Sequence, residues 1–410
     1  MTNLTVAGDD PALRPQRERR VYALDLLRFV AASMVVAFHL PAVAANEYRV
    51  NPDQAFTHPL YQLSRYGWVG VPIFFVVSGF VICMSSWGRT LSQFFTSRVV
   101  RLFPAYLFVV LLTTVVLLAW LPGDVKPPVF LRVVANLTML NQFLGVDSID
   151  GVYWSLMIEL KFYLLFALVV RVGVSYARVV GFAIMWLVLG VIAHNTTDGF
   201  LRIVVEPRYM PFFVAGITLY LIHRFGPTLL LWGMVGVCWV LCAVSLNDMV
   251  DEKIKLEHVN VTLTTTLILF SVLYLVMIAI ALGWLSWLRW SGCTTIGALT
   301  YPLYLLHKEI GTAVLHRFRG DLRLKVLLAL VLAGLLLLAY LTHRWIERPG
   351  VRLLRTGLQR SFTAIRSSAQ AAQAAQTSAS ADAPTAGGFA IRALLPMART
   401  SDHGVGSDTR

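Results

Sequence analysis

The stretch Leu24-Asp-Leu-Leu-Arg28-Phe-Val-Ala-Ala-Ser-Met-Val-Val-Ala-Phe-His39 decides the fold of this 410-residue chain. It belongs to an apolar run of about 20 residues, which is long enough to cross roughly 30 Å of hydrocarbon as a helix. We expect no cleaved signal peptide, because Asp25, Arg28 and His39 interrupt the run and a signal sequence has a shorter, uncharged one. The sequence therefore predicts a first membrane-spanning helix at residues 23–43.

The composition indicates the same class of protein for the whole chain. Apolar residues make up 57% of the sequence and charged residues only 14%, whereas soluble domains average about 45–50% and about 25%. The sequence predicts nine further spans, at residues 67–86, 103–121, 152–171, 175–193, 207–224, 227–246, 262–283, 296–315 and 325–345. We therefore predict an all-α fold, a polytopic bundle of about ten transmembrane helices.

The distribution of charge predicts the orientation of this bundle. A net charge of +13 would suggest nucleic-acid binding in a soluble protein, but here basic cytoplasmic loops account for it and no nucleic-acid partner is expected. The predicted inner loops are basic, whereas the predicted outer loop at 247–260 is mainly acidic. One predicted outer loop, with Arg317, Arg319 and Arg323, is an exception. We expect both termini in the cytoplasm, with a basic arm at residues 1–21.

Residues 356–410 differ in character from the rest of the chain. They are rich in Ala, Ser, Gln and Thr and contain few large apolar residues, so they cannot bury a core and are predicted to be disordered. The four cysteines of the chain lack the spacing of metal ligands, so we expect no metal site.

The first predicted helix carries three ionisable residues. Arg28 and His39 fall within about 20° of one stripe and about 16 Å apart along the helix axis. Asp25 lies one turn before Arg28 and can pair with it. An ionisable residue inside a span is a functional-site hypothesis by default. The alternative is structural, with Asp25 and Arg28 as an interfacial pair and His39 as a satisfied core histidine.

Two arginines precede the third predicted span. Arg98 and Arg101 have i,i+3 spacing and share one helix face. The guanidinium group is planar and permanently charged, and it binds phosphate in a bidentate manner. The arginines therefore suggest a phosphate site, although cytoplasmic loop charge explains them as well.

Two further polar stripes lie on predicted spans. Ser155, Glu159 and Tyr163 are spaced i, i+4 and i+8. We expect Glu159 at a depth comparable to that of His39, so that the two can form an orienting carboxylate–imidazole pair. On the ninth span, Thr300, Tyr304 and His307 follow at i, i+4 and i+7. By itself, each of these residues is more readily explained as structural than as catalytic.

Taken in order, the motifs resemble those of acyltransferase family 3, a family of bacterial integral-membrane acyltransferases. The matching motifs are 24–39, Phe74-Phe-Val-Val-Ser78-Gly-Phe, Arg98-Val-Val-Arg101-Leu-Phe-Pro-Ala-Tyr, Tyr153-Trp-Ser-Leu-Met-Ile-Glu159, Tyr301-Pro-Leu-Tyr-Leu-Leu-His307 and Ile346-Glu-Arg-Pro349. The resemblance covers nearly all of the predicted membrane part and implies one acyltransferase domain at 22–350.

The resemblance implies an acyl-CoA donor, usually acetyl-CoA, and transfer to a hydroxyl of a glycan or lipid-linked saccharide at the bacterial inner membrane. No permanently bound cofactor is expected. Arg28, Arg98 and Arg101 would hold the CoA phosphates. His39 would act as general base or transient acyl carrier, and Glu159 would hold its tautomer. The residues expected in the substrate pocket are Asp25, Ser78, Tyr153, Trp154, Ser155, Tyr304 and His307.

Two other classes of protein compete with an acyltransferase. A transporter or flippase of acyl or glycan substrates could use Arg28, His39 and Glu159 as an intramembrane polar relay. It would not explain two arginines at the cytoplasmic mouth. A membrane scaffold or sensor would leave the intramembrane charges unexplained. The sequence leaves the acceptor and the oligomeric state open.

Overall fold

The computed structural model describes residues 21–51, 55–56, 59–121, 123, 128–255, 259–290, 292–358, 360–361, 367–368 and 370. Within these residues the regular structure is helical and no β-strand forms, which confirms the predicted all-α class. The predicted basic arm at 1–21 and the predicted disordered tail at 356–410 lie almost entirely outside the described residues.

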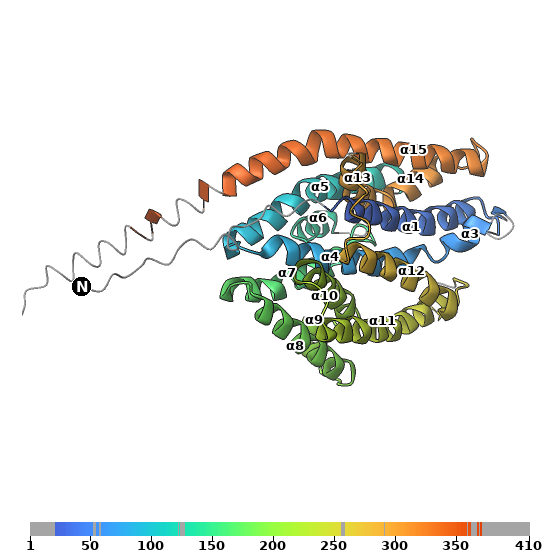
Figure 1. Ribbon diagram of the computed structural model, residues 1–410. Helices are drawn as coiled ribbons and strands as arrows, with labels where there is room; N and C mark the ends of the chain where they lie inside the picture. Colours follow the sequence, from blue (N-terminus) through green and yellow to red (C-terminus); the bar gives the residue numbers. More distant parts are fainter. Residues whose placement is uncertain are drawn as a thin grey trace, which may run out of the picture. The chain divides into compact units, whose positions relative to one another are not determined.

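The helices follow one another along the chain as shown in Figure 1. They are α1 (Tyr22–Glu47), α3 (Pro59–Ser64), the 3-10 turn η2 (Gly67–Val69), α4 (Gly70–Ser86), α5 (Leu91–Trp120), α6 (Val129–Leu137), α7 (Trp154–Val172), α8 (Tyr176–His194), α9 (Gly199–Val205), α10 (Met210–Phe225), α11 (Leu229–Lys255), α12 (Leu263–Ala281), α13 (Gly292–Leu306), α14 (Glu309–Arg317), α15 (Leu324–Thr342) and the π-helix η4 (His343–Glu347).

Seven helical segments of the described chain are long and apolar enough to cross a membrane. They are α1, η2 with α4, α5, α8, α11, α12, and α15 with its continuation to residue 358. Each of the ten predicted spans is largely helical, but the count of ten is not confirmed. Helix α7 carries Glu159, Lys161 and Arg171, α10 has 16 residues, and α13 ends at Leu306 in the middle of the predicted span 296–315.

Local sequence signals explain several helix boundaries. Thr90 and Gln93 form a reciprocal capping box at the start of α5, in which each side chain accepts the backbone N–H of the other. Gly173 and Gly226 end α7 and α10 with φ angles of 93° and 86°, a region that glycine enters without steric cost. The break between α13 and α14 falls at two polar residues, His307 and Lys308.

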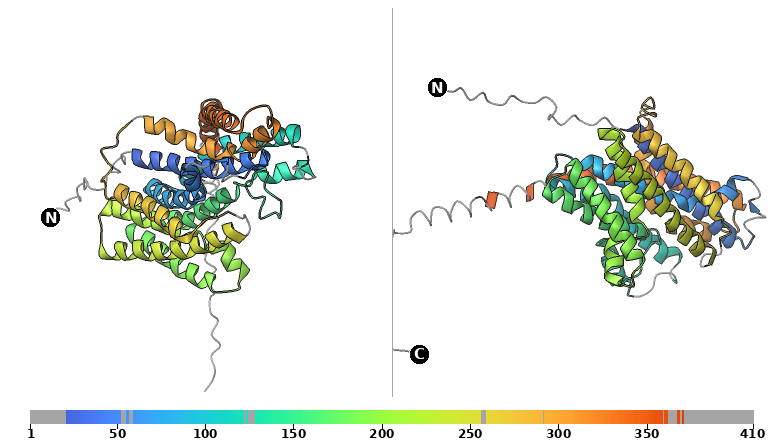
Figure 2. Two further views of the ribbon diagram at one scale, coloured as in Figure 1. Left: turned by 90° about the vertical axis from the view of Figure 1, so that its right-hand side faces the viewer. Right: turned by 60° about the horizontal axis from the view of Figure 1, so that its bottom comes forward.

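Helix α1 lies at the centre of the helix packing within residues 21–358. It contacts α4 and η2 on one side and α13, α14 and α15 on the other (Figures 1 and 2). Helix α10 packs against α4 and in turn contacts α8, α11 and α12. Residues on α1 are therefore enclosed by segments that are far apart in the sequence.

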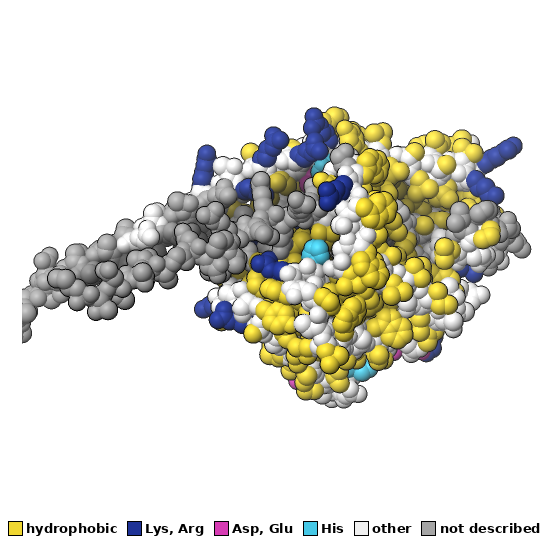
Figure 3. Space-filling model, in the orientation of Figure 1, with side chains coloured by type: hydrophobic (Ala, Val, Ile, Leu, Met, Phe, Trp, Pro, Cys, Tyr) yellow, Lys and Arg dark blue, Asp and Glu magenta, His cyan; other side chains and the backbone are white. Residues whose placement is uncertain are grey.

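The surface has the pattern expected for contact with lipid. On the face shown in Figure 3, apolar side chains cover the middle of the helical part, and most of the Lys and Arg side chains lie toward its ends. Large apolar side chains such as Leu168, Leu275 and Leu330 are more than half exposed on α7, α12 and α15. A chain with several such helices and such a surface is a multi-pass membrane protein.

Glycines allow the close approach of α4 and α10. A Cβ atom at Gly216 of α10 would overlap the carbonyl oxygen of Val76, and one at Gly79 of α4 would overlap that of Phe213. Both obstacles are backbone atoms, which cannot turn aside as a flexible side chain can. Small residues that bring helix backbones together are a common means of helix association in membranes.

We expect Gly216→Ala to destabilise the protein by about 1–3 kcal/mol, the usual cost of overpacking, because α4 and α10 must move apart. The matched control is Gly236→Ala on α11, where no described atom would lie within 4 Å of the new Cβ. That control should be neutral or slightly stabilising, because alanine favours the helix. Thermal unfolding of both variants in detergent measures the difference. Equal melting temperatures would show that the α4–α10 packing is not tight.

Candidate functional site

Two cavities lie beside α1, one at Arg28 and the other at His39. The first, here called the arginine cavity, is partly open and is lined by Arg28, Arg98 and Arg101 among others. The second, here called the histidine cavity, is also partly open and is lined by His39. Val71 and Tyr304 line both cavities, so the two spaces adjoin at these residues.

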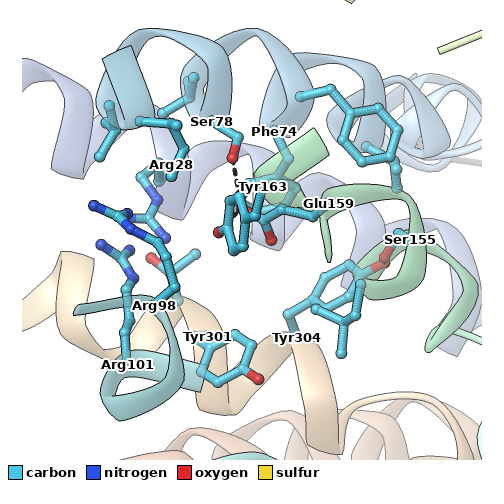
Figure 4. Close-up of a pocket in the computed structure, with 17 residues that line it drawn as sticks. Arg28, Phe74, Ser78, Arg98, Arg101, Ser155, Glu159, Tyr163, Tyr301 and Tyr304 are labelled. Atoms are coloured by element: carbon cyan, nitrogen blue, oxygen red, sulfur yellow. Dashed lines mark hydrogen bonds between the residues drawn. The ribbon is translucent and has the colours of Figure 1, made fainter. Parts of the chain in front are cut away.

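The three arginines gather at one end of the arginine cavity (Figure 4). Arg28 comes from α1, and Arg98 and Arg101 come from α5. Among the described residues that line the cavity, Glu159 is the only carboxylate, so three positive charges stand against one negative charge, a net of +2. Arg98 is 6% exposed and donates to Ser85 Oγ, but its Nε finds no acceptor among the described residues. Such an arrangement suits an anion with several oxygen atoms, such as a phosphate.

The Glu159 carboxylate belongs to the arginine cavity. Its Oε1 accepts hydrogen bonds of 2.5 Å from Ser78 Oγ and from the Tyr163 hydroxyl (Figure 4). It also acts electrostatically on Arg28. The expected hydrogen-bonded pair of Glu159 with His39 does not form among the described residues. The two residues were predicted to share a depth, but they face different cavities.

His39 instead pairs with His307, the residue at the break between α13 and α14. His39 Nδ1 lies 3.0 Å from the Val35 carbonyl oxygen and 3.3 Å from His307 Nε2. His307 is fully buried, and its Nδ1 lies 2.7 Å from the Tyr304 carbonyl oxygen. A second histidine therefore occupies the position beside His39 that was expected for Glu159.

These contacts define the tautomers of both histidines. A carbonyl oxygen only accepts, so each Nδ1 must carry the proton that it donates to its carbonyl. The single proton on His39 Nδ1 is then shared between the Val35 carbonyl oxygen and His307 Nε2. The lone pair of His39 Nε2 is left without an intramolecular partner among the described residues, on a ring that lines the histidine cavity. A neutral imidazole in this tautomer can accept a proton or attack an electrophile.

Tyr304 separates the two cavities and is held in place on several sides. Its hydroxyl lies 2.7 Å from Ser155 Oγ, which itself donates to the Val152 carbonyl oxygen at 3.0 Å. Its ring packs edge-on against Phe74, with ring centroids 5.7 Å apart. A molecule that reaches from the arginines to His39 has to pass this tyrosine.

Several residues of the histidine cavity were not predicted from the sequence. Arg208 and Glu252 form an ion pair of 2.5 Å, and the Tyr209 ring packs at a tilt of 38° against Trp154, with ring centroids 5.3 Å apart. Arg208 and Glu252 lie close to the ends of predicted apolar segments, where any membrane protein has loop charges. The sequence contains no signal that would bring these two residues together.

A buried carboxyl group connects the loop before α7 to the α13–α14 break. Asp150 is fully buried and accepts backbone N–H groups from Val152 at 3.0 Å and from Glu309 at 3.4 Å. Burial raises the pKa of Asp150 well above its usual range, and the nearby Glu309 carboxylate adds to this effect. The hydrogen bond from Glu309 to Asp150 holds the backbone in place two residues after His307. The sequence did not predict this contact.

The remaining predicted pocket residues are divided between the two cavities and their surroundings. Ser78, Ser155 and Tyr304 line the arginine cavity, and Trp154 and Tyr304 line the histidine cavity. Three predicted residues line neither: Asp25 lies against Gly297, the Tyr153 ring packs on Tyr106, and His307 acts through His39. Among the described residues, no group of three or more His, Cys, Asp or Glu side chains could hold a metal ion.

Comparisons with known proteins identify the family. The model of the acyltransferase domain of family 3 matches residues 21–344. The chain is also 28% identical over 163 residues to the acyltransferase MdmB of Streptomyces mycarofaciens, an alignment that covers 38% of this chain and 40% of that protein. No solved structure matches the chain. The family match extends over most of the chain and confirms the resemblance inferred from the order of the motifs. The chain belongs to acyltransferase family 3.

Proposed function

We propose that the protein transfers an acyl group, most simply acetyl, from acyl-CoA to a hydroxyl group of a glycan or lipid-linked saccharide. Family membership supports acyl transfer in a membrane. The observation that supports an acyl-CoA donor and a hydroxyl acceptor is that the two cavities meet at Tyr304. One cavity has the charge to hold a phosphorylated donor, and the other has a histidine with an available lone pair.

The donor enters at the arginines in this proposal. The phosphates of CoA are compact anions, and the net charge of +2 on the lining of the arginine cavity favours them. Apolar side chains such as Phe74, Phe75 and Val77 line the cavity further on and suit the uncharged pantetheine arm. The thioester would then lie at Tyr304, within reach of the histidine cavity.

His39 acts as general base in the transfer step. Its Nε2 takes the proton of the acceptor hydroxyl while the hydroxyl oxygen attacks the thioester carbonyl. When the tetrahedral intermediate collapses, the C–S bond breaks and CoA leaves as a thiol with a proton from His39. The same lone pair allows the second route, in which His39 carries the acyl group transiently. His307 and the Val35 carbonyl hold the imidazole in the required tautomer in both routes.

We further propose that both termini are cytoplasmic and that the arginine cavity opens toward the cytoplasm, in the bacterial inner membrane. The excess of Lys and Arg in the predicted inner loops supports this orientation. It also agrees with the presence of CoA in the cytoplasm. The acceptor would then approach the histidine cavity from the side of the 247–260 segment.

Replacing either Arg98 or Arg101 by alanine should weaken the binding of acetyl-CoA about ten- to 150-fold, and lysine at either position should restore only part of the affinity. This range corresponds to about 1.5–3 kcal/mol for hydrogen bonds to charged groups, and lysine lacks the planar fork. Isothermal titration calorimetry on the purified variants measures it. Arg171→Ala, an exposed position at the end of α7 that lines neither cavity, is the control and should bind normally. Normal affinity for acetyl-CoA in both test variants would show that the donor does not bind at Arg98 and Arg101.

His39→Ala should abolish the release of CoA from labelled acetyl-CoA while it leaves acetyl-CoA affinity nearly unchanged. The reason is that the base is lost but the arginines remain. His194→Ala, an exposed histidine at the end of α8, should keep full activity. If the wild-type protein moves its substrates across a vesicle membrane without releasing CoA, the protein is a transporter or flippase that uses these polar residues as a relay. A loss of acetyl-CoA binding in His39→Ala would make His39 a binding or folding residue.

A further inference from the structure

The basic segment around the start of α15 has no part in the proposed acyl transfer. Four cations, Arg317, Arg319, Arg323 and Lys325, stand there against one carboxylate, that of Asp321, which gives a net charge of +3. They form the predicted outer loop that departs from the excess of Lys and Arg on the cytoplasmic side. The charge asymmetry that orients a membrane protein therefore does not explain these cations, and another role has to account for them.

Glu47 at the end of α1 compensates only part of this charge. Its Oε2 lies 3.0 Å from His316 Nδ1 and 3.2 Å from Arg319 NH1, so this carboxylate is already used. The side chains of Arg323 and Lys325 are exposed, and neither forms an ion pair with a described residue. The first turn of α15 contains no acidic residue. These two cations are therefore left to attract an anion from outside the protein.

An open groove lies beside these two cations. Its lining consists of Val50, Ala55, Arg323, Leu324, Lys325 and Val326. The end of α1, helix α3 and the start of α15 lie at the same end of the molecule (Figure 1). The described lining residues include two cations and no carboxylate, a net charge of +2, and the other four are apolar. The groove can therefore hold an anionic group next to an apolar one.

An exposed apolar stripe on α15 begins at this groove. Val326, Leu330 and Leu337 are 48%, 55% and 59% exposed, and their spacing of four and seven residues places them on one face of the helix. Val326 also lines the groove. From Val326 to Leu337 the helix rises about 16 Å, roughly half of a hydrocarbon core of about 30 Å. The stripe thus has the length of one lipid leaflet.

A basic groove that continues into an apolar stripe favours one kind of ligand. A soluble phosphate would bind the cations but leave the stripe uncovered. A zwitterionic lipid would cover the stripe but bring a cation of its own to the groove. A lipid with an anionic headgroup complements both parts, because cations near a membrane surface attract anionic lipids.

We propose that the groove binds the headgroup of an anionic phospholipid through Arg323 and Lys325, and that an acyl chain of this lipid lies along the exposed stripe of α15. This inference is independent of the proposed acyl transfer, because the residues of the groove line neither the arginine cavity nor the histidine cavity. In the proposed orientation the lipid belongs to the outer leaflet. Its negative charge accounts for the basic character of this outer loop.

The test measures lipid binding to the detergent-purified protein by native mass spectrometry. The probes are phosphatidylglycerol, phosphatidylcholine with the same acyl chains, and glycerol 3-phosphate, which has the phosphate without the chains. The test variant is Arg323→Ala/Lys325→Ala. The matched control is Arg202→Ala/Lys255→Ala, which removes two exposed cations of α9 and α11 that do not line the groove. Both variants lower the net charge by two.

We expect the wild type to bind phosphatidylglycerol more tightly than phosphatidylcholine. The test variant should bind phosphatidylglycerol about 30-fold more weakly, since each of the two cations contributes about 1 kcal/mol. The control should match the wild type. A third variant, Arg323→Lys/Lys325→Arg, keeps both charges and should keep the affinity, which distinguishes a loss of charge from a disturbed fold.

Three results would overturn the site for an anionic lipid. They are equal affinity of the wild type for the two lipids, unchanged affinity for phosphatidylglycerol in the test variant, and an equal loss of affinity in the control. Displacement of phosphatidylglycerol by an equal concentration of glycerol 3-phosphate would also contradict the proposal, because the groove would then be a site for a soluble phosphate.

Discussion

The burial of ionisable groups on α1 is the constraint on which the site depends. A guanidinium and an imidazole on an apolar helix need either polar partners or a cavity, because hydrocarbon offers neither hydrogen bonds nor hydration. Arg28 obtains Glu159 and Asp25 as electrostatic partners, and His39 obtains His307. The helices around α1 supply these partners and leave space beside each group. The two cavities thus follow from the way in which one central helix is enclosed.

The helical class and the approximate place of most helices could be predicted from the sequence. Apolar runs indicate which segments are removed from water. Each of the ten segments predicted in this way is largely helical. The break at His307 and Lys308 was not predicted, because apolar residues continue on both sides of it. Hydropathy alone does not indicate where a helix ends and the next one begins within an apolar run. The helix at 152–171 was predicted although it carries three charges, which weaken its membrane signal.

The candidate site was predictable only as far as it follows the helical repeat. Spacing along one helix placed Arg28 and His39 on a stripe and Arg98 beside Arg101, and these residues do line the two cavities. Contacts between helices depend on rotation about each axis as well as on depth. The prediction that Glu159 faces His39 was wrong for this reason. The pairs His39–His307 and Arg208–Glu252 join segments more than 40 residues apart, and their sequence spacing contains no information about the contact.

The central claim is that the arginine and histidine cavities form one path for a donor that reaches from the arginines past Tyr304 to His39. A cryo-electron microscopy structure of the His39→Ala variant with acetyl-CoA tests this most directly, because the donor stays intact when the base is absent. The account predicts the CoA phosphates at Arg98 and Arg101 and the thioester beside Tyr304, at the boundary of the two cavities. Density for CoA outside the arginine cavity, or a thioester that points away from Tyr304, would contradict it.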